Sequence, residues 1–366
     1  MKITGVIVEC NPLHNGHITF FQKARLETDA DYLIAVMSGD YVQRGEPALV
    51  HKHARAEMLL QNGVDLVLEL PTVFATGSAE YFARCAVGIL TKLGCVNTLA
   101  FGSEDGSLSS LQDKMHLEIL PPDEPNNILG VAYLKALAYH QSSIQPHTIK
   151  RIGEAYHSTE AGASIPSATA IREICLHYPE KIATLDGIPA SVKKILLQEN
   201  TKYLSMAAFD ALLGCHLQGV TYDQLSDIFD IFPDLADKIL KNRRLYMDAQ
   251  QFTTMLKSKD IAFSHLKRAL LHLVLGYTKA DAETAIQLGY APYSRILGMR
   301  KDARALMHTI KKCSELPLIN KPTKAVKQLS PEAYTLLQKD FTSSHIYSLL
   351  SYGTIIPEET KSPLLL

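Results

Sequence analysis

Two histidines with a glycine between them stand just after the first apolar run of the chain. The run covers residues 3–8, and the histidines are His14 and His17, with Gly16 between them. Imidazole N–H groups and the backbone N–H groups at a helix N-terminus are suited to holding phosphate oxygens. They can also stabilise the charge that builds on an α-phosphate while pyrophosphate leaves. The spacing predicts a nucleotidyl-transfer site in which His14 and His17 are catalytic and Gly16 lets the nucleotide approach the backbone.

A second segment with suitable chemistry lies at residues 164–172, where small hydroxyl residues precede an arginine. Ser167 has the residue type and position of a helix N-cap. Arg172 would offer a fork of donors to phosphate oxygens. Taken alone, the segment fits a capped surface helix with a solvent-exposed arginine. Paired with the histidine loop, it favours a second part of the same nucleotide site.

The elements that must position these residues alternate between strand and helix in the first half of the chain. Apolar runs predict strands, and helical periodicity separates them. Such alternation predicts a parallel sheet with helices on both faces, and ligands beyond the carboxyl ends of the strands. The expected strands are residues 3–8, 32–37, 64–70, 97–101 and 147–152, and the expected helices are residues 17–26, 48–61, 78–93 and 127–139.

The pattern changes beyond about residue 182, where strand alternation fades and helical stretches dominate. The sequence therefore predicts an α/β protein of two domains. Residues 1–182 form a Rossmann-like parallel-sheet nucleotidyltransferase domain, and residues 183–366 form a mainly α-helical domain. A chain of 366 residues is long enough for both, since one core rarely grows past about 250 to 300 residues.

Charge is distributed unevenly along the chain. Residues 238–327 hold 18 Lys and Arg against 6 Asp and Glu, although the whole chain has a net charge of −1. This excess fits either a polyanionic partner or a solvated helical surface, and charge alone does not decide between them. If the partner is an RNA, the candidate contacts are Arg44, Arg243, Arg244, Lys267, Arg268, Arg300, Lys301 and Arg304.

Composition excludes several classes of protein. Hydrophobic residues make up 46% and charged residues 20%, as in ordinary globular proteins. No apolar stretch is long enough for a membrane span, and the N-terminal residues lack the pattern of a signal peptide. The six cysteines are scattered, which argues against a disulfide framework or a cysteine zinc site. We expect a cytoplasmic protein with no membrane association and no structural metal; the sequence does not predict its oligomeric state.

Three smaller groups of charged residues stay open. Arg44 lies in a turn-like segment and could reach a nucleotide, an RNA or only solvent. Lys150 and Arg151 leave a predicted strand end, and they could approach phosphate or form a surface pair. His51 and His53 have no carboxylate or cysteine at metal-binding spacing, so a zinc site there is disfavoured.

Beyond these patterns, the residues resemble known families. The histidine loop is similar to the HxGH signature of the nucleotidyltransferase superfamily, and residues 167–172 are similar to its second signature. Seven longer segments resemble, in order, landmarks of the bacterial tRNA(Met) cytidine acetate ligases. They are GVIVECNPLHNGH, VMSGDYVQRGEPALV, GVDLVLELP, FGSEDG, IKRIGEAYH, SATAIR and PYSRILGM. The resemblance covers most of the chain, but it places no landmark beyond residue 299.

The resemblance implies an ATP-dependent ligase. Acetate would attack the α-phosphorus of ATP, and the acetyl-adenylate would acetylate N4 of the wobble cytidine of elongator tRNA(Met). Mg²⁺ is an expected companion of the ATP phosphates. Asn11 is a candidate to hold ribose or acetate, and the family commonly has an aromatic residue where Cys10 and Leu13 stand. The implied ATP-binding residues are Ile7, Val8, Glu9, Cys10, Asn11, Pro12, Leu13, His14, Asn15, Gly16, His17, Ile18, Thr19, Phe20, Gly102, Ser167, Thr169 and Arg172.

Other functions share part of this signature. An adenylyltransferase that couples ATP to a phosphorylated small molecule would carry both signatures, although such enzymes are usually small. An aminoacyl-tRNA synthetase is disfavoured because no KMSKS-like stretch precedes the helical half. A nucleotide-sensing RNA-binding protein without catalysis is disfavoured by the intact pair of histidines.

Overall fold

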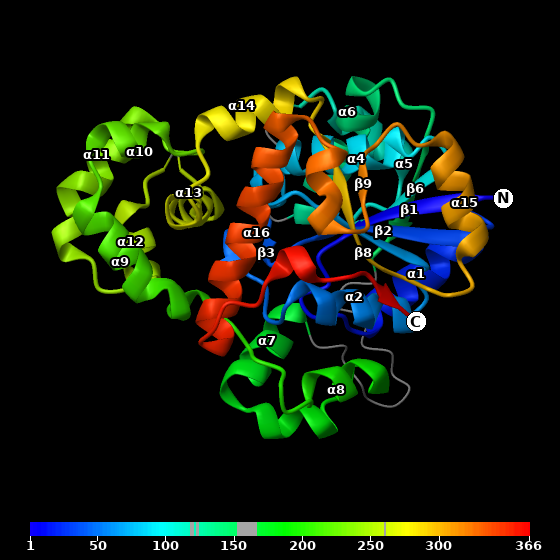
Figure 1. The fold of residues 1–366 in the computed structure, drawn as a ribbon, viewed down its shortest axis with the longest axis horizontal. Coiled ribbons are helices and arrows are strands. Elements are labelled where there is room, and N and C mark those ends of the chain that lie inside the picture. The colour runs from blue at the N-terminus through cyan, green and yellow to red at the C-terminus, as the bar shows by residue number, and fades with distance from the viewer. Residues whose placement is uncertain (118–120, 122–123, 152–166, 260) are drawn as a thin grey trace.

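An eight-stranded, mostly parallel sheet forms the centre of the computed structural model (Figure 1). The structure describes residues 1–117, 121, 124–151, 167–259 and 261–366. Strand order is β10-β8-β5-β2-β1-β6-β7, and β9 pairs with β8. The five strands that the first half contributes to this sheet are parallel: β1 (Ile3–Val8), β2 (Tyr32–Ser38), β5 (Leu66–Leu70), β6 (Thr98–Ser103) and β7 (Gln145–Lys150). The predicted parallel sheet is confirmed.

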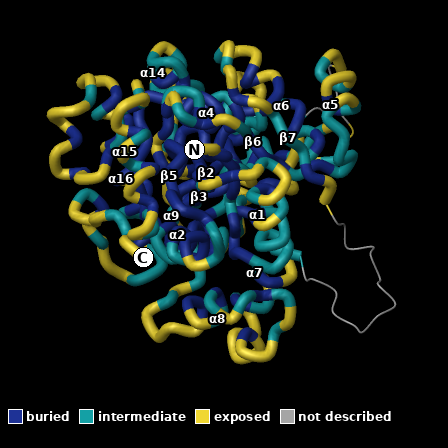
Figure 2. The backbone as a smooth tube through the Cα atoms, turned by 90° about the vertical axis from the view of Figure 1, so that its right-hand side faces the viewer, coloured by how far each residue is buried: buried dark blue, intermediate teal, exposed yellow. Residues whose placement is uncertain are grey.

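Alternating side chains of these strands serve two apolar cores, one on each face. Ile34 and Val36 of β2 face a core shared with α4 (Ala79–Lys92) and α6 (Pro125–Tyr139). Leu33, Ala35 and Met37 face the opposite core. That core includes residues of α1 (Asn15–Glu27), α2 (Lys52–Gln61), α7 (Ala168–His177) and α8 (Ala190–Leu196). The strands are the most buried part of the molecule, and the outer faces of the helices are exposed (Figure 2).

Strand order reverses direction between β1 and β6. From β1 the chain passes through α1 to β2 and then through α2 to β5, and from β5 it returns through α4 to β6 on the other side of β1. In a doubly wound sheet, ligands bind where the order reverses, beyond the carboxyl ends of the strands. The loops that follow β1 and β6 therefore define the expected place of a site.

The second half contributes most of the remaining helices. They include α9 (Asp210–Gly219), α10 (Tyr222–Asp227), α11 (Pro233–Asn242), α12 (Ala249–Leu256), α13 (Phe263–Leu275), α14 (Lys279–Gln287), α15 (Arg304–Cys313) and α16 (Pro331–Tyr352). Helices α9 to α12 form a lobe beside the sheet, and α13 lies between them and α16 (Figure 1). A short antiparallel hairpin, β3 (Tyr41–Val42) and β4 (Glu46–Pro47), follows β2, and β4 contacts α13.

The shorter elements complete the chain. They are α3 (Thr72–Ala75), α5 (Leu108–Lys114) and 3₁₀ turns at Pro179–Thr184, Met206–Phe209, Arg243–Leu245, Pro322–Lys327 and Glu358–Thr360. No described helix is both long and apolar enough to cross a membrane.

The sheet is not confined to the first half of the sequence. Strand β8 (Ser294–Met299) pairs antiparallel with β5, and β9 (Leu318–Ile319) and β10 (Leu364–Leu365) pair with β8. The sequence pattern predicts no strand in this region, because Arg295 interrupts a short apolar run and the other two strands have only two residues each. The division at residue 182 stays a prediction, but the two parts share one sheet.

Candidate nucleotide-transfer site

The histidine loop connects β1 to α1 at the reversal point of the sheet. His14 is the N-cap of α1, and its Nδ1 accepts a hydrogen bond from the backbone N–H of Gly16 at 3.1 Å. His17 Nδ1 accepts from the backbone N–H of His14 at 3.2 Å. This reciprocal capping box satisfies two backbone donors that the start of a helix otherwise leaves unpaired.

The capping box also fixes which nitrogen of each ring carries the proton. A neutral imidazole has one donor and one acceptor nitrogen. Because Nδ1 accepts in both rings, the proton is on Nε2, and Nε2–H is the group that His14 and His17 can offer a ligand. The ring centroids are 3.9 Å apart, so the two donors serve a single small region.

Both histidines are held in the neutral form. Burial, followed by the charge of Arg151, lowers the pKa of His14 to about 4. Burial lowers the pKa of His17 well below its usual value, and His14 and Arg151 lower it further. At neutral pH the pair therefore donates hydrogen bonds without carrying charge.

Gly16 is required by the histidine cap itself. A Cβ on Gly16 would lie 2.9 Å from Cε1 and 3.0 Å from Nδ1 of His14. Any side chain at this position would therefore push the imidazole out of its capping position. Glycine is therefore needed here for the cap as well as for the predicted close approach of a nucleotide.

Buried polar contacts hold the rest of the loop. Asn11 Oδ1 accepts from the backbone N–H of Leu49 at 2.7 Å, and Glu9 Oε1 accepts from Gln43 N–H at 2.6 Å. Burial raises the pKa of Glu9. These bonds tie the loop after β1 to the segment after β2. The Nδ2 group of Asn11 is the donor that it could offer in the predicted contact with ribose or acetate.

Arg55 is a residue of this region that the sequence analysis missed. Its side chain is fully buried and donates to three backbone carbonyls, those of Glu9 at 2.8 Å, Val50 at 3.2 Å and Gly39. Arg55 thereby holds together the loops that leave β1 and β2. Its position on α2, two residues after His53, gave no sequence signal for this role, because its partners are backbone atoms.

Of the predicted ATP-binding segment, several side chains lie in the core. Val8, Cys10 and Leu13 are 8%, 1% and 0% exposed, and Pro12 is buried as well. Cys10 and Leu13 therefore support the loop from below, so the family difference at these positions alters packing beneath the loop. The half-buried residues are Ile7, Glu9, His14, Asn15, Gly16, His17, Ile18, Thr19 and Phe20.

The second predicted signature reaches the same loop. Ser167 is the N-cap of α7 and accepts from Ala170 N–H at 3.2 Å. Arg172 donates from Nη1 to the Asn11 carbonyl at 3.1 Å and from Nη2 to Thr169 Oγ1 at 3.0 Å. The structure thus brings Thr169 and Arg172 to the histidine loop. Their binding of ATP stays a prediction.

Gly102 lies near the end of β6, on the other side of the reversal point. A Cβ there would lie 3.0 Å from Cγ of Arg151, whose backbone N–H donates to the Ser103 carbonyl at 2.9 Å. The absence of a side chain at Gly102 therefore lets Arg151 cross the end of β6. The rest of the IKRIGEAYH segment and the start of the second signature, residues 152–166, lie outside the described residues.

Several candidate RNA contacts are already engaged within the protein. Arg268 is 6% exposed and its Nε lies 3.5 Å from Asp230, so its burial argues against contact with an RNA phosphate. Lys267 pairs with Glu46. Arg243 donates to the carbonyls of Leu217 and Val220, where it caps the end of α9.

The remaining RNA candidates lie in different places. Arg44 is exposed between β3 and β4, near enough to Glu9 and Arg172 to influence their pKa values. Arg244 is exposed after α11. Arg300, Lys301 and Arg304 follow β8, which runs antiparallel to β5, so they lie at the amino edge of the sheet. Contact of any of these with RNA stays a prediction.

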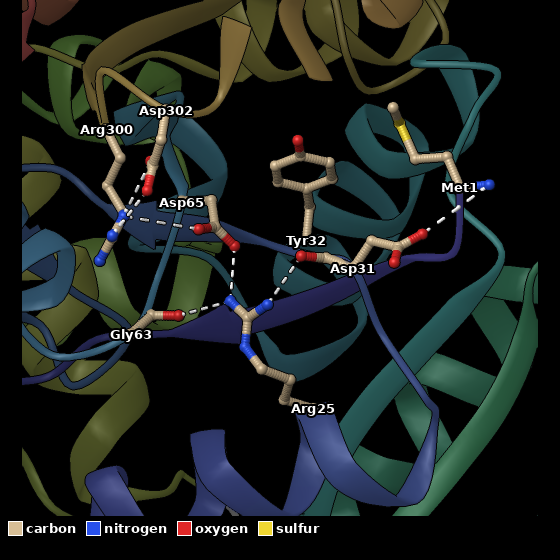
Figure 3. Close-up of a pocket in the computed structure, with 8 residues that line it drawn as sticks. All are labelled: Met1, Arg25, Asp31, Tyr32, Gly63, Asp65, Arg300 and Asp302. Atoms are coloured by element: carbon tan, nitrogen blue, oxygen red, sulfur yellow. Dashed lines mark hydrogen bonds and ion pairs between the residues drawn. The ribbon is translucent and has the colours of Figure 1, made fainter. Parts of the chain in front are cut away.

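A pocket of about 750 Å³ opens at this amino edge (Figure 3). Arg25 bonds to the carbonyls of Asp31 and Gly63 and to Asp65 Oδ2 at 2.6 Å. Arg300 pairs with Asp302 at 2.8 Å. The arginines of this pocket are thus neutralised by neighbouring carboxylates. Met1 and Tyr32 also line the pocket.

Metal ligation finds little support in the described part of the chain. No group of three or more His, Cys, Asp and Glu side chains there could hold a metal ion. His51 and His53 do approach carboxylates that are distant in sequence, Asp40 and Glu358. Lys52 lies among the same carboxylates, 2.7 Å from Glu69 and 3.1 Å from Glu358, so the group is an internal ion network.

Comparison with known proteins agrees with this geometry. A family model for the HIGH nucleotidyl transferases matches residues 1–122 and 117–361. The chain is 32% identical to the tRNA(Met) cytidine acetate ligase of Alkaliphilus metalliredigens strain QYMF, covering 95% of this chain and 94% of that protein. It is 33% identical to the tRNA(Met) cytidine acetate ligase of Bacillus subtilis strain 168, covering 95% and 92%.

Solved structures extend the likeness to the fold. The structure of Thermotoga maritima TmcAL bound with alpha-thio ATP matches with a TM-score of 0.89 and 28% identity, covering 100% of both chains. The same protein without ligand matches with a TM-score of 0.91. The chain therefore belongs to the tRNA(Met) cytidine acetate ligase family, within the HIGH nucleotidyl transferases.

Proposed function

We propose that this protein is an ATP-dependent ligase that activates acetate and acetylates N4 of the wobble cytidine of elongator tRNA(Met). The observation that carries the proposal is the reciprocal cap of His14 and His17 at the reversal point of the sheet. The names of the relatives supply the substrates, and the alpha-thio ATP bound to the Thermotoga protein supports ATP as the cosubstrate.

In the first step, a carboxylate oxygen of acetate attacks the α-phosphorus of ATP. The bond from that phosphorus to the bridging oxygen breaks, and pyrophosphate leaves with the electron pair. The Nε2–H groups of His14 and His17 donate to the non-bridging α-phosphate oxygens, where charge builds in the transition state. Neutral imidazoles can make these bonds at neutral pH without a change in their protonation state.

In the second step, the N4 amine of cytidine attacks the acetyl carbonyl of acetyl-adenylate. The carbon–oxygen bond to AMP breaks, AMP leaves, and the amine loses a proton. The products are N4-acetylcytidine, AMP and pyrophosphate. We place this reaction in the cytoplasm, where tRNA and ATP are both present.

The RNA is proposed to meet exposed basic residues near the mouth of the site and on the helical lobe. Arg44 stands beside the histidine loop, and Arg244 is exposed on the lobe. Phosphate contacts of this kind position an RNA without reading its sequence. Binding should therefore weaken steeply as salt concentration rises.

Mg²⁺ fits this site only as a companion of the ATP phosphates. Glu9, which follows β1, accepts from Gln43 N–H, and Glu104, which follows β6, accepts from Asn127 N–H. Mg²⁺ often keeps several waters and binds chiefly to substrate phosphates. When bound, it would neutralise phosphate charge, while His14, His17 and Arg172 would orient the nucleotide.

Incubation with ATP, Mg²⁺, ¹⁴C-acetate and total bacterial tRNA tests the proposal. Nucleoside mass spectrometry is expected to find the label in N4-acetylcytidine of one tRNA. If acetate is not consumed but ATP exchanges with pyrophosphate in the presence of a phosphate ester, the protein is an adenylyltransferase for a small molecule instead. A matched reaction with His17→Ala controls for any contaminating acetyltransferase.

A further inference from the structure

Arg151 lies level with the catalytic histidines, although it is distant from them in sequence. Helix α1 contacts β7, and Glu27 in its last turn accepts a hydrogen bond from His147 at 2.8 Å. From Glu27 back to His17 the helix covers about 15 Å. From His147 forward to Arg151 the chain covers about 13 Å. The two lengths nearly match, so Arg151 lies close to the N-terminus of α1.

Three contacts hold Arg151 in this place. Its backbone N–H extends the ladder with β6 by donating to the Ser103 carbonyl at 2.9 Å. Its stem crosses Gly102, where an added Cβ would lie 3.0 Å from its Cγ. Its Nη1 donates to Asn126 Oδ1 at 3.1 Å. The side chain is thus oriented by neutral groups, and its positive charge is not consumed by these bonds.

The influence of Arg151 on the two histidines agrees with this placement. Its positive charge lowers the pKa of both His14 and His17, although burial is the larger cause in each. A cation that disfavours protonation of both rings lies within electrostatic reach of both. Two neutral imidazole donors and a nearby guanidinium together favour a polyanion.

Cations flank the histidine pair on opposite sides. Arg44 and Arg172 lie toward β2, where Arg172 bonds to the loop after β1. Arg151 lies toward β7, on the other side of β1 and β6. In displacement at phosphorus, the attacking and leaving oxygens are roughly in line. The acid and the leaving pyrophosphate must therefore occupy opposite sides of the α-phosphorus, and each side has its own cation.

We infer that Arg151 binds the β- and γ-phosphates of ATP and the pyrophosphate that leaves. Its place beside an edge strand and its exposure suit a group that must be released before the second step, whereas Arg172 is half-buried. This inference rests on the proposed function for the identity of the reaction, but its test needs only binding.

Calorimetric titration of ATP, pyrophosphate and AMP tests the inference in the full-length protein. Loss of a charge-assisted bond in Arg151→Ala is expected to weaken ATP and pyrophosphate binding by about 10- to 100-fold. AMP binding should change less than about 2-fold, since AMP lacks the phosphates concerned. Arg151→Lys keeps the charge but loses the fork, and it should recover part of the affinity.

Lys150→Ala is the matched control. Lys150 is also exposed, but its stem lies against Gly106 and not against Gly102. Unchanged pyrophosphate binding in Arg151→Ala, or equal weakening of ATP and AMP, would overturn the inference. So would a rise in the acetate KM of pyrophosphate exchange without any loss of pyrophosphate affinity, because Arg151 would then serve the acid.

The two proposals fail differently. If the wild-type protein binds ATP but catalyses no acetate-dependent exchange, the proposed function fails, and the titrations still decide the role of Arg151. Circular dichroism of each variant checks its folding, and Arg151→Gln gives a second neutral replacement that retains polar contacts.

Discussion

The two edges of one sheet gather similar side chains with opposite results. At the amino edge, Arg25 and Arg300 line the pocket of Figure 3, and Asp65 and Asp302 neutralise them. At the carboxyl edge, Arg151 and Arg172 bond mainly to neutral groups. Arginines that are already paired with carboxylates are neutralised, whereas those bonded to neutral groups keep a positive charge for a ligand.

Removal of a histidine is expected to have the largest effect on the activity of the site at the carboxyl edge. His17→Ala is expected to lower kcat for acetyl-adenylate formation by about 10²- to 10³-fold, as loss of one transition-state donor does elsewhere. Pyrophosphate release in the presence of acetate measures it. His308→Ala, which removes an exposed histidine of α15, is the control. Normal pyrophosphate release by His17→Ala with an intact fold would remove this residue from the mechanism.

A smaller change disturbs the cap without removing a donor. In Gly16→Ala the new methyl group would displace the His14 ring, because the Cβ position is 2.9 Å from Cε1. A misplaced donor is expected to cost about 10²-fold in kcat. Gly219→Ala is the matched control, since nothing lies within 4 Å of a Cβ there. Equal rates in the two variants would show that the cap does not orient His14.

Loss of the Arg172 contacts between α7 and the histidine loop should have a moderate effect. Arg172→Ala removes the bonds to Asn11 and Thr169, and ATP affinity is expected to fall by about 10-fold. Calorimetric titration with ATP measures this, and Glu173→Ala alters an exposed neighbour on the same helix as a control. An unchanged ATP affinity would instead support the alternative that Arg172 is only a solvent-exposed residue of a capped surface helix.

The amino edge should tolerate a comparable change. Arg300→Ala breaks the partly exposed pair with Asp302, and such pairs contribute about 0–1 kcal/mol to stability. ATP affinity and tRNA affinity are both expected to stay within about 2-fold of wild type, whereas Arg44→Ala should weaken tRNA binding measurably. Filter binding at two salt concentrations compares the variants. If Arg300→Ala loses more tRNA affinity than this, the RNA-binding surface lies at the amino edge instead.

The sequence was sufficient for the part of the fold that positions the site. The apolar run of residues 3–8 and the HxGH spacing located β1, the start of α1 and the two histidines. The reason for Gly16 was only half visible, because the collision with the His14 ring depends on the cap geometry. Arg55 was invisible because its partners are backbone carbonyls.

Long-range pairings set the limit of prediction. Strand β8 lies more than 200 residues after its partner β5, and Arg295 within it reads as polar. In the structure Arg295 is buried beside Glu358, so the ion pair compensates for a charge that sequence patterns assign to the surface. The basic residues led to a similar error. Arg268 was predicted as a contact with RNA, but in the structure it is buried against Asp230.

The pKa of His14 also makes a prediction for stability. Its value of about 4 in the folded protein is below the ordinary value of 6.5. As pH falls from 6.5 toward 4, the unfolded chain binds a proton that the folded chain does not, so the free energy of unfolding decreases in this window. Above pH 6.5 this contribution is complete. Thermal unfolding of wild type and His14→Gln across this range measures it, and parallel curves would contradict it.

In the proposed mechanism, two neutral histidines at the carboxyl edge donate to the α-phosphate. Acetate-dependent ATP–pyrophosphate exchange, measured from pH 5.5 to 8, tests it most directly. We expect exchange that requires acetate and shows no inflection that depends on His17, because His14 and His17 stay neutral across the range. An inflection near 6.5 that disappears in His17→Ala would contradict the claim, since it would show a histidine that must change its protonation state.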